Sequence, residues 1–189
     1  QTVVDTFIDA KEYGSILNVP DADYDYALSV IDDFEQSVPV DFEAQILRGK
    51  TDDIRALVNQ AKLLSQKYDV VVTNPPYMGS SGMNEKLSKF VKTHFTNEKN
   101  DLFSCFITKG NGMIKKNGYN AMVTMQSWMF LSSFENMRKK ILDDFSIIDL
   151  LHMDNMVMGI AFGTSATVFR KKIDSNYIGT YNQITLKDI

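Results

Sequence analysis

The chain has 189 residues, which is enough for one ordinary domain and short for two. Its 44% hydrophobic and 23% charged residues are typical of a globular protein and argue against disorder. No apolar run approaches the roughly 18 residues that span a bilayer, and no secretory signal is visible. The single cysteine, Cys105, allows neither an internal disulfide nor a cysteine-rich zinc site. We therefore expect no membrane association, no metal and a reducing, cytoplasmic setting.

The net charge of −4 is unevenly distributed along the chain. Residues 1–50 contain 11 acidic and 3 basic residues, a net charge of −8, whereas residues 51–189 carry a net charge of +4. A solvated acidic face explains the first segment most simply. The mildly basic remainder is compatible with a nucleic-acid enzyme whose main basic surface lies elsewhere.

Helical spacing first becomes clear from residue 51 onward. Residues 1–50 are hard to assign, and only one short helix is expected there, over 26–36. Thr51 can cap a second helix, because two aspartates follow it and apolar residues recur at helical spacing. The β-branched run at 68–73 then predicts a strand that is buried on both faces of a parallel sheet.

Helices and strands alternate through the rest of the chain. The predicted helix over 101–116 contains Gly110 and Gly112, each of which lowers helix stability by about 1 kcal/mol relative to alanine. Alternation of this kind predicts an α/β sheet, whose ligands lie beyond the carboxyl ends of its strands. The remaining predicted elements are helices over 84–95, over 101–116 (ended by Asn117-Gly118) and from Ser132 or Ser133 to near Phe145, and strands over 119–125, 147–152 and 166–171.

The loop after the strand at 68–73 consists of Asn74, Pro75, Pro76 and Tyr77. Two prolines fix the backbone and remove two donors, which leaves rigid carbonyl acceptors beside the asparagine amide. The tyrosine adds a flat aromatic face. Such a loop can accept hydrogen bonds from an amino group and stack on a planar ring. Asn-Pro and Pro-Pro pairs are also common in plain turns, but the preceding strand and the tyrosine favour a functional site.

An ordered series of segments resembles the S-adenosylmethionine-dependent amino-methyltransferases. Residues 70–77 resemble their motif IV, and the best-known members methylate N6 of adenine in DNA. The match is good over residues 68–172 and weak over the first 50, and it is most similar to gamma-class enzymes of the Type IIG or BREX type. Further similar segments are 100–106 (motif V), 115–124 (helix end, glycine and strand), 126–131 (the following loop), 161–169 (motif VIII), and 7–10 with 13–15 (a linker).

The resemblance implies a class I methyltransferase fold. This is a Rossmann-like sheet, here partial, that is mostly parallel with an antiparallel last strand. Residues 1–50 would form an acidic linker or insert, and residues 51–189 the C-terminal half of the catalytic domain with motifs IV to VIII. We find neither the glycine-rich cofactor loop, which precedes motif IV in the gamma class, nor a target-recognition domain. Because the chain also starts with Gln1, we expect an internal fragment that alone neither binds cofactor tightly nor methylates.

The resemblance also implies a role for each site residue. The substrate would be an adenine flipped out of double-stranded DNA. The Asn74 side-chain oxygen and the Pro75 carbonyl would accept its two amino hydrogens, and Tyr77 and Phe162 would stack on its two faces. Phe106 would pack on the adenine ring of S-adenosylmethionine. Asn74 would also contribute to binding of this cofactor. Double-stranded DNA and the remainder of the parent chain are the expected partners.

Other interpretations stay open from the sequence. Phe106 lies on an apolar helix face and is equally well explained as a core residue. Cys105 fits an inert buried residue, and His152 a strand-end residue without chemistry. The loop also suits amino groups of RNA or the amide of a protein glutamine, and a noncatalytic α/β interaction module could retain it.

Overall fold

The computed structural model describes residues 3–37, 42–172 and 176–189, with the backbone alone for 42–47. It divides into two units, Gln1–Gln66 and Lys67–Ile189, which are described separately. None of the described helices is both long and apolar enough to cross a membrane.

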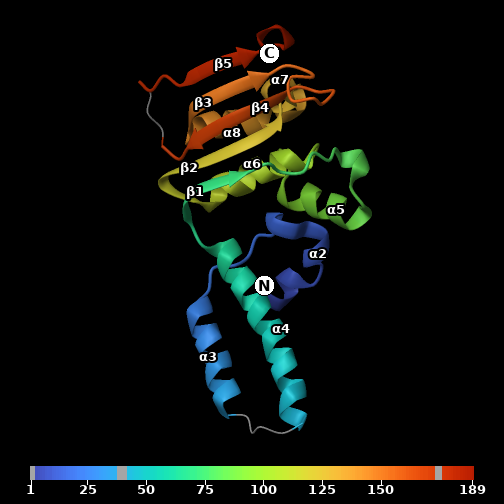
Figure 1. The fold of residues 1–189 in the computed structure, drawn as a ribbon, viewed down its shortest axis with the longest axis vertical. Coiled ribbons are helices and arrows are strands. Elements are labelled where there is room, and N and C mark those ends of the chain that lie inside the picture. Colours follow the sequence, from blue (N-terminus) through green and yellow to red (C-terminus); the bar gives the residue numbers. More distant parts are fainter. Residues whose placement is uncertain (1–2, 38–41, 173–175) are drawn as a thin grey trace. The chain divides into compact units, whose positions relative to one another are not determined.

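The first unit is helical (Figure 1). Its two longer helices, α3 and α4, pack against each other. Arg55 of α4 contacts Asp32 at 2.6 Å and Glu35 at 2.9 Å, both on α3. Part of the acidic charge near the N-terminus is therefore paired within this unit. The helices are α1 (Val3–Phe7), α2 (Ala10–Tyr13), α3 (Tyr24–Ser37) and α4 (Phe42–Ser65), with a 3-10 turn over Gly14–Ile16.

Helix α4 corrects one prediction from the sequence. The helix begins at Phe42, so the predicted start at Thr51 is wrong. Thr51 lies inside the helix, where its hydroxyl donates to the Arg48 carbonyl at 2.8 Å. A threonine can bond back to its own helix in this way, and the sequence pattern of a cap does not distinguish the two cases. The expected boundary at 50/51 also falls within α4, whereas the two units divide after Gln66.

The second unit is built on a five-stranded sheet in the order β1-β2-β4-β3-β5 (Figure 1). Strands β1 and β2 are parallel, β3 and β5 are parallel, and β4 runs antiparallel to both its neighbours. The predicted α/β class with one antiparallel strand is confirmed. The antiparallel strand is not the last one, however, because the polar strand β5 follows it. The bounds are β1 (Tyr68–Thr73), β2 (Ile114–Met125), β3 (Ser146–Met153), β4 (Thr164–Arg170) and β5 (Thr180–Ile184).

The three predicted helices of this unit are present, one of them with a corrected end, and the short helix α7 (Ser127–Phe130) lies where a loop is predicted. Helix α6 ends at Met113 and β2 begins at the next residue, so the predicted stop at Asn117-Gly118 is wrong. Asn117 instead has a φ of 66°, at a point where the β1–β2 register shifts. The helices are α5 (Glu85–His94), α6 (Leu102–Met113), α7 (Ser127–Phe130) and α8 (Glu135–Asp144), with 3-10 turns over Ser80–Gly82, Ser132–Phe134 and Leu186–Asp188.

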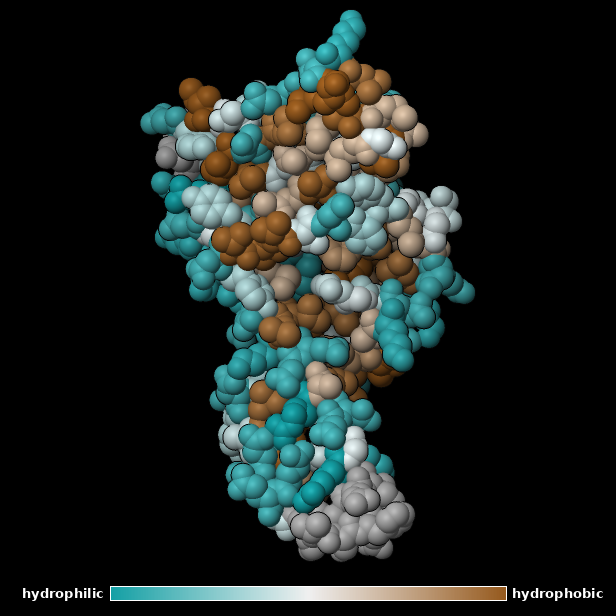
Figure 2. Space-filling view, viewed as in Figure 1, coloured by the Kyte–Doolittle hydropathy of each residue, from teal (hydrophilic) through white to brown (hydrophobic). Residues whose placement is uncertain are grey.

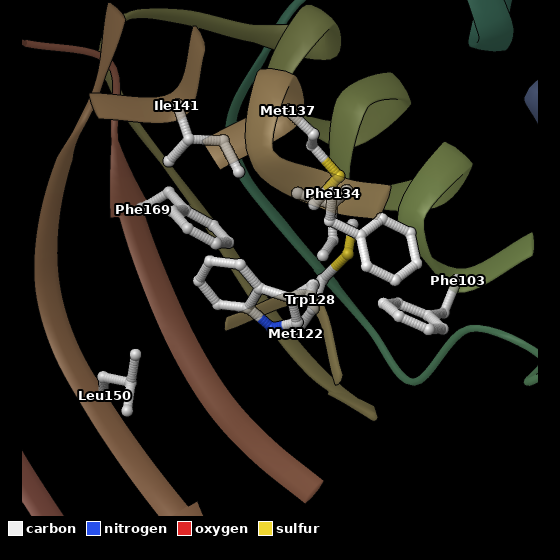
Figure 3. Close-up of a cluster of buried hydrophobic side chains, with 9 residues drawn as sticks. Phe103, Met122, Trp128, Phe134, Met137, Ile141, Leu150 and Phe169 are labelled. Carbon is white, nitrogen blue, oxygen red and sulfur yellow. The ribbon is translucent and has the colours of Figure 1, made fainter. Parts of the chain in front are cut away.

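The core of the second unit lies between the sheet and helices α6, α7 and α8 (Figure 3). Trp128 packs against Phe169 with ring centroids 5.9 Å apart, and its indole N–H donates to the Ser165 hydroxyl at 3.0 Å. Large aromatic side chains with a satisfied polar group contribute strongly to such a core. The buried cluster consists of Phe103, Ile107, Met122, Trp128, Phe134, Met137, Ile141, Leu150 and Phe169.

Strand β1 lies at one edge of this sheet and is less buried than expected. Val71 packs against the core, but Val70 is 54% and Val72 is 73% exposed. The prediction of a strand buried on both faces is therefore wrong for the described residues, because the helices cover the Val71 face. In Figure 2 several groups of hydrophobic residues are visible on the second unit, whereas the visible face of the first unit is mostly hydrophilic.

Candidate functional site

The loop 74–77 follows the carboxyl end of β1, as the sequence predicts. Its four residues differ in exposure. Pro75 is buried and fixes the loop against the unit, Tyr77 is half-buried, and Asn74 and Pro76 are exposed. The loop therefore presents the Asn74 amide to solvent from a rigid base.

The hydroxyl of Tyr77 orients this amide. Its oxygen lies 2.9 Å from Asn74 Oδ1 and 3.1 Å from the Val123 carbonyl on β2. Burial raises the pKa of Tyr77 above its ordinary value, so the hydroxyl stays protonated and remains a donor at neutral pH. Asn74 Oδ1 has two lone pairs, and one of them remains for a second donor.

The ring of Tyr77 lies between the core and a second loop. It contacts Phe103 at 6.3 Å and Phe162 at 5.8 Å between ring centroids, both edge-on. The structure thus brings together the two residues predicted to stack on a base. A ring sandwiched between them would need about 7 Å between the two planes, twice an ordinary contact distance. The edge-on pair must therefore open or turn before a base can enter.

Asp101 anchors the loop to the start of α6. Its Oδ1 accepts from the Phe103 N–H at 3.3 Å, which caps the helix, and from the Met78 N–H at 3.0 Å. Burial raises the pKa of the Asp101 carboxyl above its ordinary value, and the backbone N–H groups that donate to it act in the opposite direction. No role was predicted for Asp101, although an aspartate just before an apolar helical run is a recognisable capping signal.

Phe106 lies on α6, about one turn after the buried Phe103. Its ring is half-buried and packs against the core cluster. The remaining part of the ring is accessible from outside. The position is therefore compatible both with a core role and with a planar ligand resting on the accessible part.

Comparison with known proteins identifies the family. The family model described as Eco57I restriction-modification methylase matches residues 18–157. The chain belongs to this family. The relationship to restriction-modification methylases that the motifs predict is therefore confirmed.

Two curated relatives cover nearly the whole chain. The adenine-specific methyltransferase BrxX of Escherichia coli O9:H4 (strain HS) is 37% identical over 178 residues, which are 94% of this chain and 15% of the relative. The adenine-specific methyltransferase PglX of Lacticaseibacillus casei (strain Zhang) is 33% identical over 187 residues, which are 96% of this chain and 16% of the relative. The chain therefore spans about a sixth of the length of these family members.

The fold is also similar to a solved structure of a type I restriction-modification system. The two superpose with a TM-score of 0.51 at 19% identity, over 66% of this chain and 25% of the other. At this identity the likeness concerns the fold alone.

Proposed function

We propose that this chain is part of an adenine-specific DNA methyltransferase of a restriction-modification or phage-defence system. The observation that carries the proposal is the solvent-facing Asn74 amide, held by Tyr77 at the carboxyl end of β1. It occurs in a chain of the restriction-modification methylase family, whose relatives BrxX and PglX are named adenine-specific methyltransferases.

The loop suits an amino group as the reacting atom. An exocyclic amine has two N–H donors, and the free lone pair of Asn74 Oδ1 and the Pro75 carbonyl are two acceptors for them. When both hydrogens are held, the lone pair of the amine is left free to attack. S-adenosylmethionine, when bound, supplies a methyl group on a positively charged sulfur. Held by Asn74 and the Pro75 carbonyl, the amine would accept that methyl group through its lone pair and would release one proton to solvent. Positioning provides most of the rate in such a transfer.

Phe106 and Asn74 are the residues that this chain would contribute to cofactor binding. The half-buried ring of Phe106 fits a stacked purine, because one part is fixed in the core and the other is accessible. The exposed Asn74 amide can donate as well as accept. Both side chains therefore fit a ligand with a flat ring and polar substituents.

Tyr77 and Phe162 would hold the flipped adenine between them. Enzymes that modify a base in a duplex must extrude it, and stacking on aromatic side chains offsets part of the lost stacking. The contact between the two rings fits a state without substrate, in which each ring covers the other. We expect double-stranded DNA as the substrate, further protein segments as partners and a cytoplasmic setting.

The test uses the complete gene product, S-adenosylmethionine and unmethylated DNA, with N6-methyladenine measured by mass spectrometry. The wild type should form methyladenine, and Asn74→Ala should reduce kcat by about 10²- to 10³-fold, as expected for a lost positioned hydrogen-bonding group. Asn136→Ala, on the exposed side of α8, is the matched control and should retain activity. If the wild type modifies RNA or protein amides but not DNA, the substrate proposal is wrong. If Asn74→Ala retains full activity, the site proposal is wrong.

A further inference from the structure

Gln126 contacts the backbone that carries Phe162. Gln126 follows the end of β2, and Gly163 lies between Phe162 and the start of β4. The Gln126 N–H donates to the Gly163 carbonyl at 3.1 Å, and the side-chain amide packs directly on the Gly163 Cα. A Cβ on Gly163 would lie only 2.5 Å from Cδ and Oε1 of Gln126. The absence of a side chain at Gly163 therefore lets the amide approach this closely.

The same amide is held from its other side by His152 near the end of β3. His152 Nε2 makes a hydrogen bond with Gln126 Oε1. Because an amide oxygen only accepts, the proton of this bond lies on Nε2. The His152 ring also packs against Phe130, with 5.6 Å between centroids, and Nε2 lies 3.6 Å from Asp154 Oδ1. These contacts fix the amide against Gly163.

We propose that Gln126 is a positioning residue for Phe162. The proposal rests on the function proposed above. The loop 154–163 closes a turn within itself, since the Met156 N–H donates to the Ile160 carbonyl at 2.8 Å, and Met156 is 49% exposed. The contact between Gln126 and Gly163 ties its last residue to the end of β2. This contact fixes the position of the backbone next to Phe162, and with it the position of the Phe162 ring relative to Tyr77.

Gln126 is suited to be tested because it is not packed in the core. It lines an open cavity of about 580 Å³ together with residues of the β3 end and the C-terminal segment. A displaced amide can therefore move into this space without disturbing the buried cluster. Substitution at Gln126 or Gly163 should thus shift the loop while leaving the unit folded.

The test is a double-mutant cycle in the complete gene product with the variants Gln126→Ala, Gly163→Ala and both together. Each single variant should lower kcat for methylation by about 5- to 100-fold, the range for the loss of one aromatic stacking partner. The double variant should be no worse than Gln126→Ala, because the alanine methyl then has no amide to displace. The KM for DNA should stay within about twofold, since phosphate contacts dominate DNA affinity.

Two further measurements separate positioning from a general structural effect. A DNA with 2-aminopurine in place of the target adenine should show a weaker fluorescence increase on binding both single variants. Gln126→Glu, which keeps the side-chain length and an acceptor for His152, should restore most of the kcat and of the fluorescence increase. Gly112→Ala is the matched glycine control, because a Cβ there meets no atom within 4 Å, and it should keep the wild-type kcat and fluorescence increase.

The outcomes distinguish this inference from the proposed function. Additive losses in the double variant, or a loss confined to KM with normal 2-aminopurine fluorescence, overturn the positioning role while the methyltransferase assignment stands. A lowered melting temperature that accounts for the lost activity of both single variants also overturns it. A wild type that forms no methyladenine overturns the proposed function and, with it, this inference.

Discussion

The ring of Phe162 meets the ring of Tyr77 edge-on, with centroids 5.8 Å apart and planes inclined by 73°. Tyr77 follows β1, whereas Phe162 precedes β4. The two meet because β4 runs against the other strands, so its amino end lies at the edge where β1 and β2 have their carboxyl ends. The antiparallel strand thus adds a second loop to the edge at which α/β sheets bind ligands.

Replacing Phe162 with alanine should weaken capture of the flipped base. Stacking of one base on an aromatic side chain is worth about 1–3 kcal/mol, so kcat should fall by about 5- to 100-fold. Phe162→Tyr keeps the ring and should retain most activity. Rates of N6-methyladenine formation by the complete gene product measure the effect, with Phe34→Ala on α3 as a control. Equal activity of Phe162→Ala and wild type would rule out a stacking role.

Asp101 provides a prediction on stability and pH. Asp101→Ala removes the cap of α6 and the bond to the Met78 N–H, and should lower the free energy of unfolding by about 1–2 kcal/mol. Asp101→Asn keeps an acceptor oxygen and should lower the free energy of unfolding by a smaller amount. Urea unfolding of the three proteins at neutral pH measures both effects, and equal losses in the two variants would contradict the capping role.

The pH dependence of Asp101 has a defined sign. Burial raises its folded-state pKa above the unfolded value, so the folded state binds the proton more tightly. The contribution of this ionisation to stability is greatest below the unfolded pKa and declines as the pH rises through the raised pKa. Asp101→Asn cannot ionise, so its stability relative to wild type should increase with pH across this window. A constant or falling difference would contradict the raised pKa.

The thiol of Cys105 should be unreactive in the folded protein. Cys105 is fully buried, and burial raises its pKa to about 12. Only about one thiol in 10,000 is then ionised at pH 8, and the thiolate is the reactive form. A thiol-specific disulfide reagent should label the chain only after addition of denaturant. Rapid labelling of the folded protein would contradict both the burial and the pKa.

The two glycines of α6 should respond in opposite directions to alanine. A Cβ on Gly112 meets no atom within 4 Å, so Gly112→Ala should stabilise the helix by about 0.5–1 kcal/mol. A Cβ on Gly110 would lie 2.5 Å from Met122 Cε and 2.8 Å from Asn120 Nδ2. Gly110→Ala should therefore lower the free energy of unfolding. Urea denaturation gives the difference in unfolding free energy, and effects of the same sign would contradict this packing.

The sequence predicts those elements whose residue pattern is strong by itself. Strand β1, the loop 74–77 and strands β3 and β4 combine apolar runs with clear boundaries, and all were expected near their observed positions. The sequence pattern does not predict strand β5, because this strand is polar and mostly exposed. It forms through backbone pairing with β3, which leaves no hydrophobic pattern in the sequence.

Positions that depend on other segments could not be predicted from local pattern. The sequence predicts the junction of α6 and β2 too late in the chain, because Asn117-Gly118 resembles a helix end. In the structure Gly118 instead allows close passage of β1, since a Cβ there would lie 2.9 Å from the Asp69 carbonyl. The bond of Asp101 to Met78 and the contact of Gln126 with Gly163 likewise join distant parts of the chain.

The Tyr77 hydroxyl has one proton and two acceptors, Asn74 Oδ1 and the Val123 carbonyl. It can donate to only one of them at a time. When a ligand draws the Asn74 amide away, the proton can turn to Val123, so no donor is left unpaired. An unpaired buried donor would cost about 1–3 kcal/mol. The carbonyl on β2 therefore acts as a reserve acceptor, which lets Asn74 reorient with little loss of free energy.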